Sequence, residues 1–329
     1  MDVSRQWIDV CVTTDGKSIL HRQFENNTMG FKAMIKWIKE FSKQLNEWLI
    51  CMEHTGMYTL PLWHFLTEKN ISYCVIAGSV ITSGLEIRRG KNDKIDATDI
   101  AKFTMRYQDE LKPHRLPTQI LQRLKMLFGY RERLVKAKVL ISVPANEAKQ
   151  FAAKESKEMR TDSSSLVQII EARIKKVEKL ILEIINSDER TANCYKLIVS
   201  VPGFGLVTAC YLLIVTQCFT ILTRSRELSN FGGTAPHPHK SGKSIEGKTR
   251  VSPIADKKLK ALLSRGAGSL LQYNEEIKRY AARLMTKGKH ENLVRNNIKN
   301  KMLHMVCAVV KRGTPYIENY VSPYQQNVA

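Results

Sequence analysis

Four acidic residues have the types and positions that metal-dependent phosphate chemistry requires. Asp2 opens the first strand-like segment, Glu53 follows the apolar segment 48–52, and Asp93 and Asp96 stand three apart where a helix should begin. Carboxylates at i and i+3 share one helical face, and residues at strand ends lie at the rim of a sheet, so the four can converge. Carboxylate oxygens suit Mg²⁺, and two such ions about 4 Å apart could activate an attacking oxygen and stabilise a leaving one in phosphodiester chemistry.

Each of these acids also has an ordinary interpretation. Asp93 and Asp96 are acids of a first helical turn, which the helix dipole favours, and Glu53 could pair with a surface cation. For each acid taken singly, the ordinary interpretation is preferred. Only the four acids together predict a metal site. Asp99 extends the spacing and is interpreted as a solvated or supporting group. Because a single residue precedes Asp2, the strand that carries it is expected to be short and frayed.

A second candidate group surrounds Ser241. The chain near it is rich in proline, glycine and positive or titratable side chains, which are His237, His239, Lys240, Lys243, Lys248 and Arg250. Such cations could hold a phosphate. A serine hydroxyl is a poor nucleophile unless a base or a metal activates it, so the acidic residues would have to provide the metal. Away from that context, Ser241 would be a solvated loop serine.

Two further segments have patterns that fit nucleic-acid contacts. Residues 201–205, Val-Pro-Gly-Phe-Gly, resemble the hairpin of a helix-hairpin-helix element, in which Gly203 and Gly205 would let backbone amides approach a phosphate. A tight turn between two core helices fits equally well. Segment 295–312 predicts a helix with an apolar face and a basic face that includes Lys311 and Arg312. That face suits backbone contacts with DNA or RNA, or serves only as a solubilising surface.

The composition favours a polyanionic partner. The 329 residues include 52 Lys and Arg against 31 Asp and Glu, a formal charge of +21, and 43% are hydrophobic, enough for packed cores in two or three domains. No run of about 18 apolar residues is present, so membrane binding is not expected. The seven scattered cysteines include no CxxC pair, and no signal peptide appears, which predicts reduced core cysteines and a cytoplasmic protein.

The periodicity divides the chain into three parts. In residues 1–115, strand-like segments 2–14 and 18–25 are followed by a helix over 31–41, the strand 48–52, a helix around Trp63 and the strand 73–76. A β-meander followed by alternating helices and strands predicts an α/β domain of the ribonuclease H type.

The other two parts are predicted to be helical. In residues 116–194, a helix runs from 118 to about 140 and is ended by Pro144, and a polar stretch 155–165 separates it from the next. Val167–Ile184 then carries apolar residues at spacings of three and four, which predicts a coiled coil or a single amphipathic helix. Residues 195–329 predict a mainly helical C-terminal domain.

The segments around these residues resemble the insertion sequence 110 family of transposases. Three signatures carry the resemblance: Met-Asp-Val-Ser-Arg at 1–5, Met-Glu-His-Thr-Gly-Met-Tyr at 52–58 and Arg-Arg-Gly-Lys-Asn-Asp-Lys-Ile-Asp-Ala at 88–97. The third is the most specific. The likeness continues through 201–205, through Phe-Gly-Gly-Thr-Ala-Pro at 231–236 ahead of Lys-Ser-Gly at 240–242, and into Lys-Arg-Gly-Thr-Pro-Tyr at 311–316. It therefore extends over nearly the whole chain.

The resemblance implies more than the residues alone. It implies a RuvC-like, that is ribonuclease H-like, domain with a four-carboxylate (DEDD) site for Mg²⁺, a coiled-coil connector, and a C-terminal transposase domain whose catalytic serine matches Ser241. Serine attack on DNA would give a covalent phosphoserine intermediate, and base pairing to a structured bridge RNA would choose donor and target DNA. A homo-oligomer, dimer or tetramer, with active sites shared between subunits is also implied, in the bacterial cytoplasm or nucleoid.

Three alternatives are weighed against a transposase that uses both groups. Residues 242–249, Gly-Lys-Ser-Ile-Glu-Gly-Lys-Thr, match the phosphate-binding loop of nucleotide hydrolases, but a genuine loop follows a strand and opens a helix, whereas this one follows prolines and runs into Val-Ser-Pro. A junction nuclease would use the carboxylates with water and would not need Ser241. A decayed transposase would bind nucleic acid without cleaving it.

Overall fold

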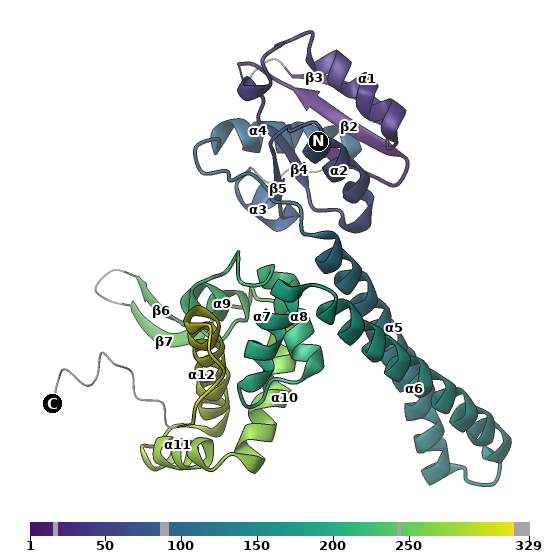
Figure 1. The fold of residues 1–329 in the computed structure, drawn as a ribbon, viewed down its shortest axis with the longest axis vertical. Coiled ribbons are helices and arrows are strands. Elements are labelled where there is room, and N and C mark those ends of the chain that lie inside the picture. The colour runs from purple at the N-terminus through teal and green to yellow at the C-terminus, as the bar shows by residue number, and fades with distance from the viewer. Residues whose placement is uncertain (16–18, 86–91, 242–244, 319–329) are drawn as a thin grey trace. The chain divides into compact units, whose positions relative to one another are not determined.

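The chain forms two compact units, Met1–Leu116 and Pro117–Ala329 (Figure 1). The computed structural model describes residues 1–15, 19–85, 92–241 and 245–318, without the side chains of 238–246 and 248. The first unit combines strands and helices and the second is mainly helical, which confirms the coarse prediction of an α/β part followed by a helical part. The finer division at 115 and 194 stays a prediction.

The first unit is built on two groups of strands that meet at β1. Strands β1, β2 and β3 are antiparallel, β4 and β5 are parallel, and their bounds are Asp2–Val3, Trp7–Val12, Leu20–Glu25, Ile50–Glu53 and Tyr73–Ile76. The Met1 nitrogen donates a hydrogen bond to the Cys51 carbonyl at 2.8 Å, which places β1 beside β4. Strand β1 is short, as predicted, but the expected fraying is wrong, because Met1 and Val3 are only 6% and 2% exposed.

Helices cover both faces of these strands, and the side-chain alternation of β4 shows how. Ile50 and Met52 belong to a core with residues of α1 (Thr28–Ile38) and α2 (Leu60–Glu68). Cys51 points the other way, into a core with residues of α3 (Gly78–Ser83) and α4 (Asp93–Arg106). Successive strand residues face opposite sides, so one apolar strand contributes to two cores. Two 3₁₀ turns, Leu45–Glu47 and Gly56–Thr59, flank β4.

The second unit begins with two long helices that run antiparallel, α5 (Gln119–Phe151) and α6 (Lys157–Asn186). Arg131 donates to Glu178 at 2.7 Å and Lys138 to Glu171 at 2.8 Å. The later residue of α5 thus pairs with the earlier residue of α6, as expected for antiparallel helices. The apolar seam of α6 becomes buried toward its C-terminal end, at Val177, Ile181, Ile184 and Ile185. The two helices therefore pack along the predicted seam.

Two sequence predictions about this helical pair are wrong. Pro144 lies inside α5 and does not end it, and the stretch 155–165 is helical from Lys157 onward. A proline removes one backbone donor and crowds the preceding turn, a cost of about 3 kcal/mol that the packing of neighbouring residues can offset. The turn between the helices spans Ala152–Ser156, where the Ser156 hydroxyl donates to the Ala152 carbonyl.

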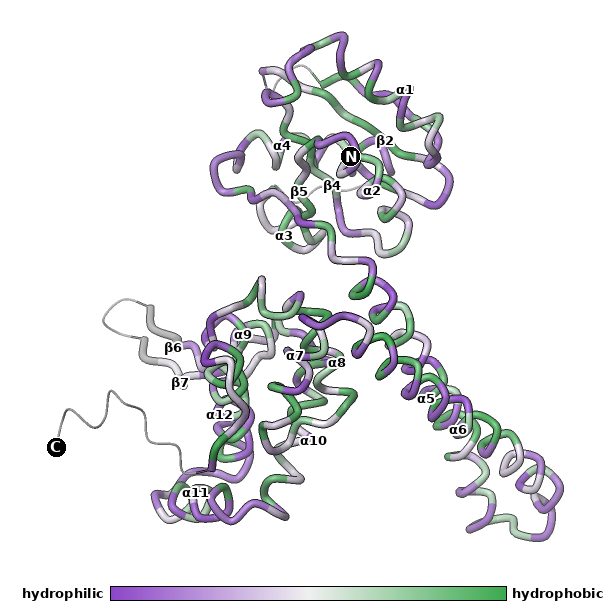
Figure 2. The backbone as a smooth tube through the Cα atoms, in the orientation of Figure 1, coloured by the Kyte–Doolittle hydropathy of each residue, from purple (hydrophilic) through white to green (hydrophobic). Residues whose placement is uncertain are grey.

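The remaining helices share one hydrophobic core. They are α7 (Glu189–Ser200), α8 (Leu206–Thr216), α9 (Ser225–Phe231), α10 (Lys257–Tyr273), α11 (Glu275–Thr286) and α12 (Glu291–Arg312). Figure 2 shows α8 as a predominantly hydrophobic helix, in agreement with the complete burial of Ala209, Cys210, Leu212 and Leu213. Across the described ranges, no helix combines the length and apolar character needed to cross a membrane.

An antiparallel hairpin interrupts these helices between α9 and α10. Strand β6 (Pro236–Ser241) pairs with β7 (Ile245–Val251), and the register shifts between His237 and His239. The sequence predicted a loop here because of its prolines. A first strand position and a bulge on an edge strand are the places where a sheet tolerates proline, so this prediction is wrong for a definable reason. Figure 1 shows the hairpin extending from the helices around it.

Candidate metal and nucleophile sites

The charges of the other three predicted metal ligands affect the pKa of Asp2. Burial raises the pKa of its carboxyl, the nearby carboxylates of Asp96, Asp93 and Glu53 raise it further, and the adjacent amino group partly opposes them. Electrostatic effects of this kind fall off over several ångströms, so the four acids lie in one neighbourhood. Residues far apart in the sequence are thus brought together, in the combination that the sequence predicted.

Asn92 fixes the place where Asp93 and Asp96 begin their helix. Its side-chain oxygen accepts a hydrogen bond from the Ile95 nitrogen at 2.8 Å, the usual arrangement of an N-terminal cap. Both aspartates therefore occupy the first turn of α4, where the helix dipole favours negative charge. Further along the same helix, Ala97 and Ile100 are buried against the strands, which holds α4 in place under the acids.

Glu53 reaches the site from the last position of β4. Its backbone is opposite Ile76 in the parallel pairing with β5, and the following amide, His54, donates to the Ile76 carbonyl at 3.1 Å. Gly78 lies against the Glu53 carboxylate so closely that a Cβ there would stand 2.1 Å from Oε1. Gly78 is thus a residue of the site that sequence reasoning missed, because nothing in its flanking sequence marks a contact with Glu53.

The donor set is chemically suited to a hard divalent cation. It consists of carboxylates alone, and their mutual repulsion, seen at Asp2, is what a bound cation would neutralise. Among the described residues, no group of three or more His, Cys, Asp or Glu side chains is arranged so that it could hold a metal ion. Asp2, Glu53, Asp93 and Asp96 therefore fit a divalent cation in the chemistry of their side chains, but their described arrangement is not that of a formed metal site.

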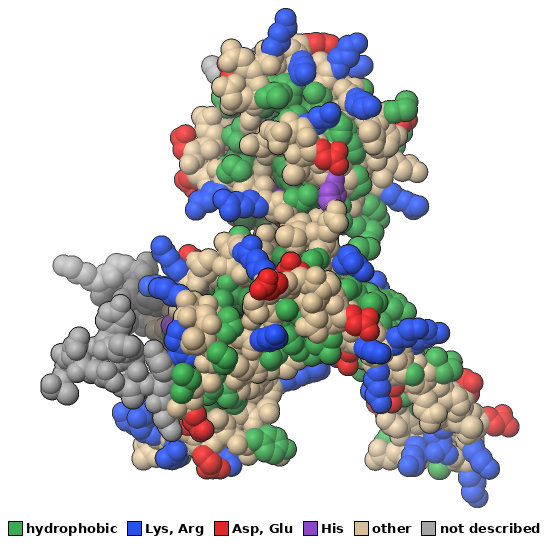
Figure 3. Space-filling view, viewed as in Figure 1, with side chains coloured by type: hydrophobic (Ala, Val, Ile, Leu, Met, Phe, Trp, Pro, Cys, Tyr) green, Lys and Arg blue, Asp and Glu red, His purple; other side chains and the backbone are tan. Residues whose placement is uncertain are grey.

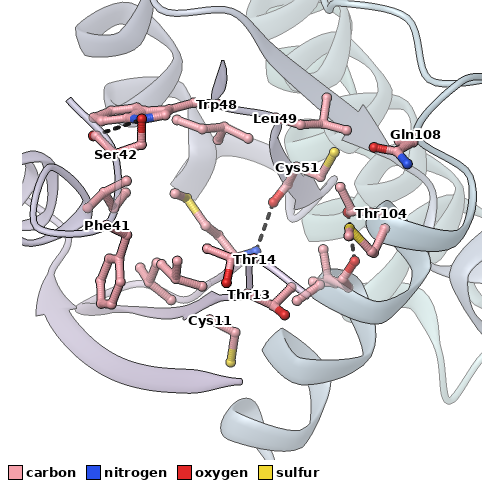
Figure 4. Close-up of a pocket in the computed structure, with 18 of the residues that line it drawn as sticks. Cys11, Thr13, Thr14, Phe41, Ser42, Trp48, Leu49, Cys51, Thr104 and Gln108 are labelled. Carbon is pink, nitrogen blue, oxygen red and sulfur yellow. Dashed lines mark hydrogen bonds between the residues drawn. The ribbon is translucent and has the colours of Figure 1, made fainter. Parts of the chain in front are cut away.

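A cavity of about 420 Å³ opens beside this site but does not include the four acids (Figure 4). It is lined from β2, β4 and α4, by apolar side chains together with Thr13, Thr14, Thr104 and Gln108. The hydrogen bond from Met1 to Cys51 crosses its wall. Glu47 is the one carboxylate among its described lining residues.

Ser241 is the last residue of β6, at the end of the hairpin. Its backbone is opposite Ile245 in the β6–β7 register. Gly242 and Lys243 lie outside the described residues, as do the side chains of Lys240, Ser241 and Lys248. The strand β7 that follows argues against the nucleotide-binding loop, since a helix would have to begin there.

Gly203 and Gly205 have different environments between α7 and α8. Gly203 has a φ of +87°, and a Cβ there would stand 3.0 Å from Leu270 and from Met302, so it packs into the core of the unit. Gly205 caps the N-terminus of α8 and has open space around its Cα. Only Gly205 keeps the geometry that a phosphate contact needs, and Gly203 fits the alternative of a tight turn between core helices.

The cations of the predicted basic face of α12 also differ from one another in their environments. Lys311 is exposed, whereas Arg312 donates to the Pro315 carbonyl at 2.7 Å and so holds the segment after the helix. Lys301 is neutralised by Glu276 at 2.7 Å. Arg250, on β7, is exposed. Figure 3 shows Lys and Arg side chains on the visible face of both units, as the charge of +21 leads one to expect.

Comparison with known families finds matches in two parts of the chain. Residues 1–143 match an IS110-type DEDD family described as "Transposase", and residues 195–282 match the "Transposase IS116/IS110/IS902 family". This chain belongs to the IS110 family of transposases. The resemblance read from the three sequence signatures is thereby confirmed.

Curated relatives extend the likeness over almost the full length. The "Pilin gene-inverting protein" of Moraxella lacunata and that of Moraxella bovis are each 22% identical over 323 residues, 96% of this chain and 96% of theirs. The transposase is accordingly an enzyme of DNA recombination that acts on DNA. A DEDD domain is consistent with dependence on a divalent metal ion.

Proposed function

We propose that this transposase cuts and rejoins DNA by attack of Ser241 on a phosphodiester, with Mg²⁺ held by Asp2, Glu53, Asp93 and Asp96 in a RuvC-like unit. The observation that carries the proposal is the electrostatic convergence of three carboxylates on Asp2, from β4 and from the first turn of α4. Structural acids are normally placed near cations, whereas these are placed near one another. The mutual repulsion of these acids is what a bound cation would relieve, and this supports the proposed metal site.

In the proposed chemistry one phosphorus–oxygen bond forms for each one that breaks, so no nucleotide has to be hydrolysed to supply energy. The Ser241 Oγ–phosphorus bond forms as the bond from phosphorus to one sugar oxygen breaks; the serine proton leaves to solvent, and the departing sugar oxygen takes one up. Attack by a hydroxyl of another DNA end on the phosphoserine reverses these changes and joins the new strands. Mg²⁺ would neutralise charge on the phosphate and favour the ionised nucleophile.

The decisive experiment traps the covalent intermediate. Full-length protein is incubated with Mg²⁺ and labelled DNA that carries the ends of its own insertion element, quenched in denaturant, and resolved by electrophoresis. We expect a labelled protein–DNA adduct whose mass spectrum places the nucleotide on Ser241, and no adduct with Ser241→Ala. Strand cleavage by Ser241→Ala at the wild-type rate would instead favour the junction nuclease, with water as the nucleophile.

Selection of donor and target by a bridge RNA, and assembly into a dimer or tetramer, belong to the same proposal. The charge of +21 supports a nucleic-acid partner but does not distinguish RNA from DNA. Sequencing of RNA that copurifies with the protein tests the first part. A specific transcript from beside the gene is expected, and RNA of random cellular origin would contradict guided recognition. Light scattering of the purified complex tests the second part.

A further inference from the structure

The two glycines before the β6–β7 hairpin are wedged between α10 and α12. A Cβ on Gly232 would stand 3.2 Å from Leu259 of α10 and 3.5 Å from Leu303 of α12. Gly233 has a φ of +61°, and a Cβ there would meet Ala255 at 2.4 Å. The base of the hairpin that carries Ser241 is therefore held by direct backbone packing against both helices.

Polar contacts hold the same turn. Thr234 is completely buried, its carbonyl accepts from the Asn296 side chain at 2.9 Å, and its hydroxyl contacts the Asn300 side-chain oxygen at 3.2 Å. The Asp256 nitrogen donates to the Phe231 carbonyl at 2.8 Å and connects the start of α10 to the end of α9. These contacts determine which side chains of α10 and α12 lie beside the base of the hairpin.

The side chains at that place are cations. The Cδ and Nζ of Lys260 each stand 3.8 Å from the Cβ position of Gly233. Lys299 lies on α12 between Asn296 and Asn300, and burial, with the charges of Lys260 and Arg295, lowers the pKa of its ammonium group. Both lysines are half-buried, and within the described ranges neither forms an ion pair with a carboxylate.

Neighbouring cations on the same helix behave differently. Arg295 is exposed and pairs with Glu291 at 2.7 Å, and Lys301 pairs with Glu276 at 2.7 Å and lies over the Tyr280 ring. Lys260 and Lys299 are thus a pair of like charges, partly removed from water, and no acid of the described side chains forms an ion pair with either. Half-buried cations without a partner cost free energy in the unbound protein, which an anionic ligand would recover.

We propose that Lys260 and Lys299 form a binding site for a backbone phosphate of the DNA strand that the β6–β7 hairpin acts on. Two ammonium groups on different helices can hold one phosphodiester as point charges, without reading its sequence. Because Gly232 and Gly233 are packed tightly, the base of the hairpin that carries Ser241 is held beside the two lysines. The assignment to the reacting strand rests on the serine mechanism proposed above, whereas the binding of DNA phosphate does not.

The test compares two doubly substituted full-length proteins of equal charge. Lys260→Gln with Lys299→Gln removes the site. Lys278→Gln with Lys287→Gln, the α11 variant, removes Lys278 of α11, which pairs with Glu275, and the exposed Lys287 that directly follows this helix. Binding of a fluorescent mixed-sequence DNA duplex is measured over a salt series with Ser241→Ala in every protein, so that no chemistry intervenes. We expect the site variant to bind about tenfold more weakly at ~0.15 M salt, with a salt slope reduced by roughly one to two, and the α11 variant to change little.

Further measurements separate the possible failures. Lys260→Arg with Lys299→Arg should restore binding, and the site variant should unfold no earlier than wild type, since a repulsion has been removed. Equal affinities and slopes for the site and α11 variants would overturn the proposal. A second outcome would also overturn it: inorganic phosphate raises the melting temperature of the wild type but not of the site variant, while both proteins bind DNA equally well. The site would then take only the free ion. Cleavage by Ser241→Ala would refute the serine mechanism and leave these binding results standing.

Discussion

The carboxylates of the first unit and the lysine pair of the second are opposite in charge but alike in construction. In each, like charges from different elements lie close together, Asp2 with Glu53 in one case and Lys260 with Lys299 in the other. Ordinary surface pairs of the same molecule, such as Lys138 with Glu171, are balanced. Concentrated like charge is therefore what the two proposed ligand-binding regions share and what these ordinary pairs lack.

The two regions differ in how the backbone supports them. Gly78 leaves room for a side chain, the Glu53 carboxylate, whereas Gly233 packs against the Cβ of Ala255. A carboxylate at the end of a flexible side chain can move aside, but the Cβ of Ala255 cannot do so without moving its backbone. Damage at the first glycine should therefore affect chemistry, and damage at the second should affect folding.

The largest expected effect is on chemistry at the carboxylates. Asp93→Asn should lower the single-turnover rate of DNA strand cleavage by about 10³-fold or more, because it removes negative charge from the proposed metal site. Asp99→Asn, two turns into the same helix, is the matched control and should keep activity within a few-fold. Comparable losses in the two variants would mean that the acidic charge of α4, and not a defined site, is what matters.

The second effect separates the two glycines. Gly233→Ala should destabilise the protein by about 2–3 kcal/mol, from a positive φ and a displaced neighbour, whereas Gly78→Ala should change stability by under about 1 kcal/mol. Gly78→Ala should instead slow cleavage about tenfold or more by displacing the Glu53 carboxylate. Urea unfolding and single-turnover cleavage are measured on both.

Gly268→Ala serves as the control for these glycine variants. Gly268 lies within α10 with open space around its Cα, so alanine should stabilise the helix by about 0.5–1 kcal/mol. Loss of stability in Gly78→Ala equal to that in Gly233→Ala would remove the proposed difference between the two regions.

Much of the carboxylate site was predictable from the sequence because its parts are local. The strand Tyr73–Ile76 was predicted from an apolar run, and the start of α4 lies at Asp93, where the sequence placed the beginning of a helix. The four acids could then be grouped because strand ends and a first helical turn meet at a sheet rim. Their placement around a bound metal stays a prediction.

The lysine pair was not predictable from the sequence. Lys260 and Lys299 lie on different helices, and nothing in either segment indicates that α10 and α12 will both pack against Gly232. The errors in the helical pair have a similar cause. The proline and polar signals at 144 and 155–165 are local, and packing between α5 and α6 outweighs them. Tertiary contacts of this kind leave no periodic trace in one sequence.

A smaller effect should appear in the stability of the carboxylate region. The pKa of Asp2 is raised in the folded state, so its ionised form is destabilising: the penalty is absent below the unfolded value near 4 and develops as pH rises through the folded value. At pH 7.5 without divalent ions, Asp2→Asn should therefore stabilise the protein by about 0.5–1 kcal/mol. Mg²⁺ should stabilise the wild type more than Asp2→Asn, as measured by thermal unfolding. An equal response to Mg²⁺ would place the cation elsewhere.

The smallest expected effect has the opposite dependence on pH. The pKa of Lys299 is lowered in the folded state, so its charged form is destabilising below the folded value, and the penalty disappears as pH rises toward the unfolded value of about 10.5. Lys299→Gln should stabilise the free protein by a few tenths of a kcal/mol at pH 7.5 and low salt, and the gain should shrink with added salt, because exposed charges are screened. Lys278, which is paired with Glu275, provides the contrast: Lys278→Gln should give no gain at any salt concentration. Matching unfolding midpoints for the two variants across the salt series would show that the charge at Lys299 is already balanced. The lysine pair would then not be a group of unbalanced like charges, whereas the conclusion about the carboxylates would stand.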